Sequence, residues 1–589
     1  MIVKMKKVTL IVTEKNRDDA LYKLRKLGVL HVRSLKNEVT ENVNELLALK
    51  SSLEKAETII DVFSSSKNKK AKDVSLLIED VLKCSSDLAK AESELTDLQK
   101  TVSWFDKFGK ISLKSVDLLK ENGIYITFYQ ADKSGLKNIP EDKNVQIAKQ
   151  DGSVVYCALI SEDPEDRLDF KELLMPETEW NKLKDDIKNK QQEIGNLKKK
   201  LLSYADYKDS ISEFKKELDK KIEFAMVKAS MGSEEAFAYI QGFCPDDTVE
   251  TIKSKADKEG WAYIISDPED PKEVPTLLRN PKWVNIVKPL FDFMGTLPGY
   301  HEIDVSIVFL AFFSIFYAML IGDAGYGFIF LISTVIFRRK LKDSPAEPFS
   351  LMYLLSGATI LWGLLSGTWF GSEQIAQLPV LKNFIVPKLD SFSDVSQPFV
   401  MQLTFIIGAV HLSVARLMSA FKKINSPTAI AELGWVAILW GIYFVANNLI
   451  LGTPLNSYVL PLIGAGAFIV ALFANFQKNI IKGFLLSLGN LPLDMISSFS
   501  DIVSYIRLFA VGFATVIVAT SFNDMAAGVG LNSVFSGLIM AVILVFGHGL
   551  NIVLGMMAVL VHGVRLNMLE FSGHVGVEWS GKPYMPFKE

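Results

Sequence analysis

The stretch Asp501-Ile-Val-Ser-Tyr-Ile-Arg507-Leu-Phe-Ala-Val-Gly-Phe-Ala-Thr515 places a charged side chain, Arg507, inside one of the most apolar parts of the chain. A second arginine, Arg565, lies near the end of the next apolar helix. A guanidinium keeps its proton in proteins, so at membrane depth it costs about 2.5–3.5 kcal/mol on insertion scales. Such residues usually face a bundle interior or a water-filled cavity, and they mark ion paths.

Charge divides the 589 residues into two halves. Residues 301–589 hold only 15 of the 64 Lys and Arg and 15 of the 67 Asp and Glu. We therefore expect a soluble region over residues 1–300 and a membrane domain over residues 301–589. The three cysteines form no CxxC motif, which fits a reducing cytoplasm. The net charge of −3 gives no support for nucleic-acid binding.

Residues 1–300 are predicted to form α/β lobes joined by a long antiparallel coiled-coil hairpin. Apolar residues recur at alternating steps of three and four over residues 38–110 and 176–222, a spacing typical of coiled coils. Strand-like runs between the coils predict a distal α/β lobe over residues 112–175. A proximal lobe is expected from residues 1–36 and 224–285. The first coil is interrupted at Ser64–Lys72, and two unrelated coils with separate partners are the alternative.

The second half is predicted to be all-α, with eight membrane spans of about 20 apolar residues each. If residues 1–300 lie inside, the outside loops hold only Lys382 and Lys388, which satisfies the rule that positive residues stay inside. We therefore expect a multi-pass protein of the cell membrane, with the N-terminal half and the C-terminus in the cytoplasm. The predicted spans are 304–320, 322–338, 350–370, 399–420, 433–451, 458–476, 491–522 and 533–569. The inside residues are Arg338, Arg339, Lys340, Lys342, Arg416, Lys422, Lys423, Lys478, Lys482, Lys582 and Lys588.

Polar and small residues share one predicted face of the last span. They follow helical spacing and are His548, Asn551, Gly555, Ala558, His562 and Arg565. Helix–helix packing alone would explain a lone histidine. With an arginine on the same face, we favour an ion path.

The preceding helix carries a second set of polar residues. Ser504 shares a face with Arg507, and Asp501 and Asp494 lie toward the cytoplasmic end, where they would form a hydrated entry. For Asp494 a simple position among the lipid headgroups is equally consistent.

An arginine in this position suits ion release. A carboxylic acid beside a guanidinium has its pKa lowered by about 1–3 units, so it releases its cation or proton there. The predicted spans offer no mid-membrane Glu as an obvious partner, and Glu570, which we also place on the ion path, lies at the very end of the last helix. The carboxylate therefore need not belong to this chain.

The sequence predicts no cofactor and no hydrolytic site. Gly576-Val-Glu-Trp-Ser-Gly-Lys-Pro583 is similar to a phosphate loop, but Pro583 stands where Ser or Thr is required. We interpret this stretch as a C-terminal tail.

The whole pattern resembles subunit I, also called subunit a, of prokaryotic V-type and A-type rotary ATPases. The motifs that carry the resemblance are Gly322-Asp323-Ala-Gly-Tyr-Gly327, Ser504-Tyr-Ile-Arg507-Leu, His562-Gly-Val-Arg565-Leu-Asn-Met-Leu-Glu570-Phe, Gln241-Gly-Phe-Cys-Pro245 and Tyr584-Met-Pro586-Phe587. The resemblance implies that Arg507 faces a rotating proteolipid ring, supported by Arg565, and that the ring supplies the carboxylate. It also implies a stator arm that binds peripheral stalk subunits of the E/G type, contact with a central-stalk or ring-cap subunit and with membrane lipids, and ATP hydrolysis by other subunits.

Two other classes of protein compete with this interpretation. A stand-alone ion-coupled transporter would predict internal repeats, and spans 1–4 show no repeat in spans 5–8. A membrane-anchored scaffold would use its arginines only to bind neighbours or lipid. The sequence leaves open whether H⁺ or Na⁺ moves, and whether the complex pumps ions or makes ATP.

Overall fold

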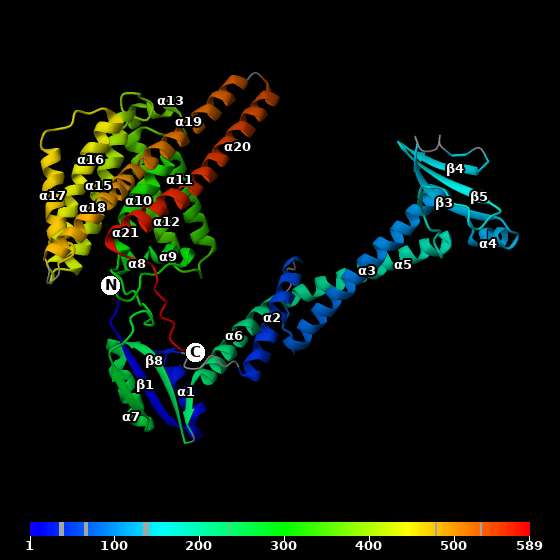
Figure 1. Cartoon of the computed structure of the whole chain (residues 1–589), viewed down its shortest axis with the longest axis horizontal. Helices are drawn as coiled ribbons and strands as arrows, with labels where there is room; N and C mark the ends of the chain where they lie inside the picture. Colours follow the sequence, from blue (N-terminus) through cyan, green and yellow to red (C-terminus); the bar gives the residue numbers. More distant parts are fainter. Residues whose placement is uncertain are drawn as a thin grey trace. The chain divides into compact units, whose positions relative to one another are not determined.

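The computed structural model describes residues 1–33, 40–63, 69–133, 139–140, 142–234, 236–476, 480–530 and 533–588. The chain divides into two compact units: Met1–Arg33 with Glu235–Lys588, and Ser34–Glu234. The first unit holds an α/β lobe and the apolar helices, and the second holds a helical arm with another sheet (Figure 1). Lys478 and residues 64–68 of the predicted coil break lie outside the described residues.

A sheet with strand order β2-β8-β1-β9 forms the proximal lobe of the first unit. Strand β1 runs antiparallel to both β8 and β9, which brings the start of the chain together with residues beyond 236. At Gly242 an added Cβ would lie 2.4 Å from the carbonyl oxygen of His31, so glycine lets β2 approach β8. The elements are β1 (Met5–Thr13), α1 (Arg17–Leu27), β2 (His31–Arg33), β8 (Phe237–Pro245), α7 (Val249–Glu259) and β9 (Ala262–Ser266).

Residues 576–588, the C-terminal strap, run from the apolar helices to the proximal lobe (Figure 1). Along the strap, the Lys582 carbonyl accepts a hydrogen bond from the Thr276 N–H at 2.7 Å, and the Phe587 N–H donates to the Leu30 carbonyl at 2.9 Å. The Phe587 side chain is 2% exposed. The strap is therefore part of the lobe's packing and its hydrogen bonding.

Two motifs that lie far apart in the sequence meet where this strap packs on the proximal lobe. Phe243 of the Gln241–Pro245 motif is buried with Met5 and Val274, and Tyr584 of the strap packs against this cluster. The Tyr584 hydroxyl donates to the Val29 carbonyl at 2.5 Å. Both motifs therefore contribute to the packed core of the proximal lobe.

The remainder of the first unit is built of apolar helices. Within the residues described, five helical stretches are long and apolar enough to cross a membrane, or six if the pair α10–α11, bent by 119°, counts as one span. Each of the eight predicted spans overlaps one or two of the helices given at the end of this paragraph. Helix α17 is shorter than a full span, however, so the number eight stays a prediction. The helices are α10 (Ser306–Ile321), α11 (Ala324–Lys340), α12 (Glu347–Ser366), α15 (Gln397–Lys422), α16 (Thr428–Leu451), α17 (Val459–Phe473), α18 (Ile480–Ser504), α19 (Ile506–Val529) and α20 (Val534–Ala558).

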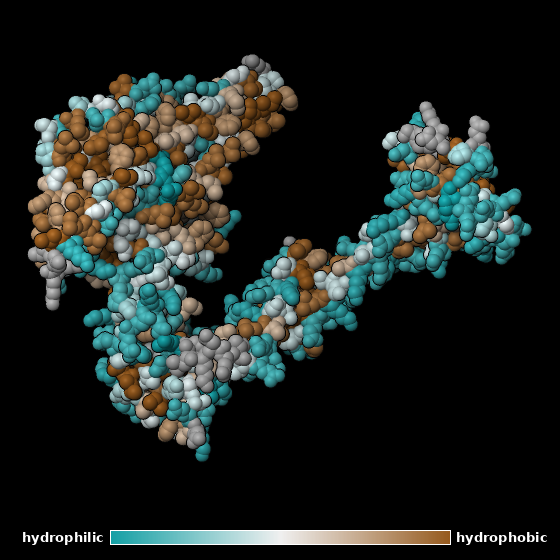
Figure 2. Space-filling view, in the orientation of Figure 1, coloured by the Kyte–Doolittle hydropathy of each residue, from teal (hydrophilic) through white to brown (hydrophobic). Residues whose placement is uncertain are grey.

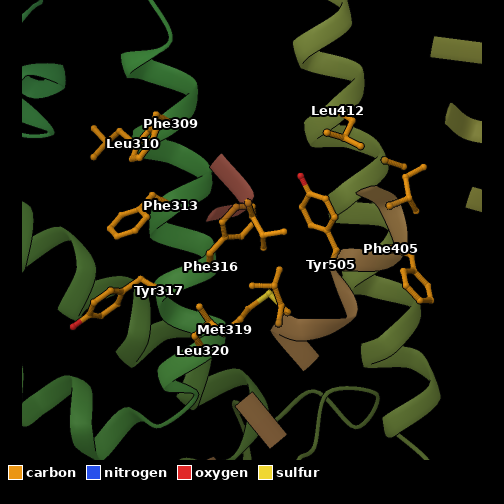
Figure 3. Packing of buried hydrophobic residues seen from close by; sticks show 14 of the residues in the cluster. Phe309, Leu310, Phe313, Phe316, Tyr317, Met319, Leu320, Phe405, Leu412 and Tyr505 are labelled. Atoms are coloured by element: carbon orange, nitrogen blue, oxygen red, sulfur yellow. The ribbon is translucent and has the colours of Figure 1, made fainter. Parts of the chain in front are cut away.

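Aromatic side chains fill the space between these helices. Phe316 of α10 and Phe405 of α15 are fully buried, and Tyr505, between α18 and α19, points into the same cluster (Figure 3). Apolar side chains also cover much of the outer face of the helices (Figure 2). The stretch Val534–Val575, which begins with α20, shows this most clearly, since only 11% of an apolar 18-residue part of it is buried. An apolar interior and an apolar exterior together indicate a membrane-integral domain.

The tight reversal between α10 and α11 is fixed by Gly322 and Asp323. Gly322 has a φ of 70°, which favours glycine, and Asp323 caps α11. The buried Asp323 carboxylate accepts four backbone hydrogen bonds, two from α11 and two from the loop after α12, at Phe370 and Gly371. The first motif of the membrane domain therefore forms a structural turn that also holds the next loop.

In the second unit, four helices form the arm: α3 packs against α5 and α2 packs against α6. The shared core contains Leu53, Val81, Leu201 and Leu218. Between α5 and α6 the helix breaks into a 3-10 turn, where the buried Asp206 pairs with Lys69 at 2.8 Å. The helices are α2 (Glu41–Asp61), α3 (Val74–Phe108), α5 (Trp180–Tyr204) and α6 (Lys208–Ser230).

The far end of α3 and the start of α5 carry the distal lobe. Its sheet has the order β4-β5-β3-β6. Trp104, Phe105 and Phe108 of α3 pack on Phe128 of β3 and Leu183 of α5, so the arm and the lobe share one aromatic core. The elements are α4 (Leu113–Glu121), β3 (Tyr125–Asp132), β4 (Asn144–Asp151), β5 (Val154–Ser161) and β6 (Lys171–Glu172).

Candidate functional site: a carboxylate shared by two arginines

Arg507 follows a break in the long apolar segment. Helix α18 ends at Ser504, Tyr505 lies between the helices, and α19 begins at Ile506. The carbonyls of a last helical turn lack partners within their helix. Arg507 Nε donates to the Ser504 carbonyl at 2.9 Å, so the break itself supplies an acceptor for the guanidinium. A continuous predicted span, 491–522, did not reveal this break.

The two arginines singled out in the sequence share one carboxylate. Arg507 Nη2 lies 2.8 Å from Glu570 Oε1, and Arg565 Nε lies 3.6 Å from the same oxygen. The Glu570 side chain is only 5% exposed, whereas the Arg507 and Arg565 side chains are 21% and 55% exposed. Glu570, a predicted ion-path residue, is therefore also the carboxylate that pairs with both arginines, a pairing that the sequence did not indicate.

A change of helix type explains why the sequence pattern did not pair Glu570 with Arg507. After α20 the chain forms π-helical turns at Val559–Gly563 and Leu566–Phe571. Hydrogen bonds from i to i+5 widen the turn, and such turns occur frequently at functional sites. Residue 570 therefore comes near the direction of residue 565, whereas a regular helix would turn it to another side.

The predicted polar face of the last span does not form one continuous environment. His548 and Asn551 point toward neighbouring helices, whereas Arg565 is exposed. Gly555 is buried, and a Cβ there would lie 3.0 Å from Ile321. His562 is partly buried, and its Nδ1 is buried without a hydrogen-bond partner among the described residues.

His548 and Asn551 belong to a separate cluster around Tyr326 of α11. The Tyr326 hydroxyl lies 2.8 Å from His548 Nδ1 and accepts from Asn551 Nδ2 at 3.0 Å. His548 Nε2 lies 3.1 Å from Asn523 Oδ1. A neutral His548 then donates to Asn523 and accepts from Tyr326, so the cluster links α11, α19 and α20.

Asp501 belongs to a third cluster, which the sequence did not predict. His574 Nε2 lies 3.0 Å from Asp501 Oδ2, and Arg416 Nε donates to His574 Nδ1 at 3.0 Å. Because Arg416 can only donate, His574 Nδ1 must accept, and its Nε2 carries the hydrogen that reaches Asp501. Arg416 also pairs with the buried Glu432 at 3.1 Å, which joins α18, α21 (Ser572–Val575), α15 and α16.

The remaining predicted entry residue stands apart from these clusters. Asp494 is exposed on α18, so the structure leaves both a headgroup position and an entry role open for it. Ser504 touches Arg507 through its backbone carbonyl. No group of three His, Cys, Asp or Glu side chains is arranged to hold a metal ion within the described parts of the chain.

Sequence reasoning missed Glu432, His574, His411 and Tyr505 as site neighbours. The sequence pattern assigns Arg416 only to the positive residues of an inside loop. A buried charge gives a signal when it interrupts an apolar run, and Glu432 does interrupt one, in Ile430-Ala-Glu-Leu-Gly434. Histidines and tyrosines inside helices give no such signal.

Comparison with known proteins gives relatives that match the chain from end to end. No family model matches it. The chain is 35% identical over 624 aligned residues to V-type ATP synthase subunit I of Borreliella burgdorferi, with 100% of each chain covered. It is 30% identical over 625 residues to V-type ATP synthase subunit I 1 of Treponema pallidum, again with 100% of each covered.

More distant matches cover part of the chain. A-type ATP synthase subunit I of Methanocaldococcus jannaschii is 25% identical over 401 residues, covering 61% of this chain and 56% of that one. A crystal structure of the cytoplasmic N-terminal domain of subunit I, homolog of subunit a, of V-ATPase covers 44% of this chain and 100% of its own at 14% identity, with a TM-score of 0.27 that is too low to compare the folds. On the strength of the two end-to-end relatives, the chain belongs to the subunit I family of V-type and A-type ATP synthases, as its motifs predicted.

Proposed function

We propose that the chain forms the stationary side of the ion path in a rotary ATP synthase, and that Arg507 drives release of H⁺ or Na⁺ from a carboxylate on a rotating ring of small hydrophobic subunits. The observation that carries the proposal is the single buried Glu570 shared by Arg507 and Arg565. Two guanidinium groups and one carboxylate leave one positive charge unbalanced. In an apolar surrounding such a charge attracts an incoming carboxylate far more strongly than it does in water.

The release step follows from this charge. A protonated or cation-bearing ring carboxyl that approaches Arg507 has its pKa lowered by about 1–3 units, so it gives up its cation there. While Arg507 engages the ring, Arg565 keeps Glu570 paired, and no buried charge is left alone. When the ring carboxylate moves on, Arg507 returns to Glu570. The fixed positive charge also prevents cations from passing straight through.

The outer face of α20 fits a partner in the membrane. Val545 and Phe546 are 76% and 65% exposed, within the apolar stretch Val534–Val575, which is mostly unburied. This face would contact the ring and surrounding lipid, with Arg565 beyond its inner end. Asp494, Asp501 and Ser504 would lie on the cytoplasmic entry, and His548, Asn551 and His562 on the path beyond Arg507.

The soluble parts would hold this site against torque. In the proposal, the paired helices of the arm are an antiparallel coiled-coil hairpin, and the distal lobe binds peripheral stalk subunits of the E/G type. The proximal lobe would lie at the membrane, near a central-stalk or ring-cap subunit. This assignment requires eight spans, with the N-terminal half and the C-terminus in the cytoplasm. Salt bridges such as Lys190–Glu94 and Lys215–Glu57, which join paired helices of the arm, support a stiff arm.

The test is ATP-driven ion uptake into vesicles that carry the assembled complex, with Arg507 intact and with Arg507→Ala. Arg339→Ala, at the exposed end of α11, is the matched control. Loss of uptake in assembled Arg507→Ala, with normal uptake in the control, supports the proposal. Uptake at the normal rate in Arg507→Ala contradicts it and leaves the scaffold function. Uptake by the isolated chain without a ring favours the stand-alone transporter.

A further inference from the structure

His411 of α15 is completely buried among aromatic rings, and one of these rings belongs to the residue that follows Glu570 in the chain. Its exposed fraction is 0%. Its imidazole stacks on Phe312, with ring centroids 4.0 Å apart, and on Phe571, with centroids 4.4 Å apart and planes 9° from parallel. Phe571 directly follows Glu570 in the chain. One face of the histidine therefore fixes the residue next to the carboxylate of the ion pair.

The same imidazole also holds the segment that carries Arg507. His411 Nδ1 lies 2.8 Å from the Tyr505 hydroxyl, and both side chains are fully buried. Tyr505 occupies the break between α18 and α19, two residues before Arg507. The backbone there makes i-to-i+3 bonds, from the Tyr505 N–H to the Ile502 carbonyl at 3.2 Å and from the Leu508 N–H to the Tyr505 carbonyl at 3.0 Å. The bond to His411 ties this tightened turn to α15, and so restrains the segment that carries Arg507.

Helix α15 is shaped to receive this tyrosine. At Gly408, one turn before His411, an added Cβ would lie 2.6 Å from the Tyr505 ring. Glycine thus opens a slot for the ring, and His411 binds the hydroxyl at the end of that slot. Phe316 of α10 closes it on another side, with ring centroids 6.0 Å apart (Figure 3).

Core packing alone does not explain a histidine here. Burying a polar ring is unfavourable unless its nitrogens are hydrogen-bonded. His411 Nε2 is buried and has no hydrogen-bond partner among the residues described. A phenylalanine would fill the same stack without a buried polar atom. What the imidazole adds is the bond to Tyr505 at the same time as the stack on Phe571.

We propose that His411 is a positioning residue that sets the geometry of the Arg507–Glu570 pair, through the Tyr505 hydroxyl on the arginine side and the Phe571 ring on the carboxylate side. This inference rests on the proposed role of Arg507 in ion release. It assigns to α15, which carries neither member of the pair, control over the distance between them.

Four variants and a control test this assignment in the assembled complex. His411→Phe keeps the stack and removes the hydrogen bond, and Tyr505→Phe removes only the hydroxyl. His411→Asn retains a hydrogen-bonding side chain, and the double variant His411→Phe/Tyr505→Phe closes a cycle. Ser413→Ala, on the same helix, is the control, because the buried Ser413 hydroxyl has no hydrogen-bond partner within the described chain. The quantity measured is ATP-driven ion uptake per assembled complex.

We expect uptake per complex to fall about tenfold or more in each Phe variant, since a misplacement of about 1 Å near a reacting group can cost about a hundredfold. The double variant should be no worse than either single variant, His411→Asn should recover part of the loss, and Ser413→Ala should match the unmodified complex. If His411→Phe does not assemble, Tyr505→Phe carries the test, because it deletes a single oxygen.

A purely structural role gives a different result. In that case the His411 and Tyr505 variants lower the amount of assembled complex but leave uptake per complex unchanged. This result overturns the inference, provided that Arg507→Ala still abolishes uptake. If Arg507→Ala itself transports normally, the proposed function fails first, and the role of His411 in that function fails with it.

Discussion

Arg507 Nη2 donates a hydrogen bond to Glu570 Oε1 at 2.8 Å, across 63 residues of sequence. The carboxylate is more deeply buried than the arginine, at 5% against 21% exposed. Removing one partner of a buried ion pair typically costs about 3–5 kcal/mol, because the other charge is left unpaired. We therefore expect the Glu570 side chain to stabilise this site and to hold Arg507 in place.

We predict that Glu570→Gln retains assembly and lowers ATP-driven ion uptake about tenfold, since the amide still accepts a hydrogen bond but about 1.4 kcal/mol or more of charge pairing is lost. Glu570→Ala should in addition reduce the amount of assembled complex. Asp524→Asn, an exposed carboxylate on α19, is the control and should have no effect. Unchanged uptake in Glu570→Gln would show that the negative charge is not needed.

Asp323→Ala should destabilise the membrane domain. The carboxylate accepts four backbone hydrogen bonds, and each buried donor left without a partner costs about 1–3 kcal/mol. We expect a lower unfolding temperature of the detergent-solubilised complex and faster proteolysis of the loop after α12. Asp323→Asn, which keeps one acceptor oxygen, should lie between. A thermal stability equal to that of the unmodified protein would contradict the capping role.

Phe587→Ala should loosen the C-terminal strap. The ring is 2% exposed and lies under Arg25, with the guanidinium carbon 5.6 Å from the ring centroid. Truncating a buried phenylalanine typically costs about 3–5 kcal/mol. Limited proteolysis should then cut the strap, whereas Met585→Ala, at a side chain 69% exposed, should leave it protected. Equal cutting of the two variants would mean that the strap does not depend on this contact.

The contact between the strap and the proximal lobe should weaken in mild acid. Burial lowers the pKa of His31 from its ordinary value of 6.5, although its hydrogen bond to the Met585 carbonyl opposes this. Below pH 6.5 the unfolded lobe takes up a proton that the folded lobe resists, so stability falls as the pH falls toward the lowered pKa. We expect thermal unfolding of the lobe to shift downward between pH 7 and pH 5.5, and His31→Gln to reduce that shift. The same pH dependence in His31→Gln would assign the effect to another group.

The pattern of charged and apolar residues along the sequence predicted the two arginines of the site and the positions of the apolar helices. Arg507 and Arg565 were recognisable because a permanent charge in an apolar run is costly, and that cost does not depend on tertiary structure. The helices were likewise predictable from apolar length. The lone Asp323 before Ala-Gly-Tyr-Gly327 fits the sequence of a tight reversal with a capping residue.

The partners of these residues were not predictable. Glu570 reaches Arg507 through a π turn, and the sequence pattern assumed regular helical spacing throughout. His574 meets Asp501 and Arg416 across separate helices, and no spacing rule relates residues on different helices. His411 and Tyr505 lie in aromatic surroundings that are typical of any core. In this protein, the sequence identified the buried arginines, whereas tertiary packing determines which side chains neutralise and orient them.

The C-terminal strap has a consequence for biosynthesis. The ribosome makes Leu30 long before Phe587, yet the two residues close the same lobe through a backbone hydrogen bond. Contacts so distant along the chain form late, and unfinished surfaces are exposed in the meantime. The lobe is complete only after the apolar helices have been synthesised, so a chain that stalls during insertion carries an unfinished lobe that proteases and chaperones can recognise.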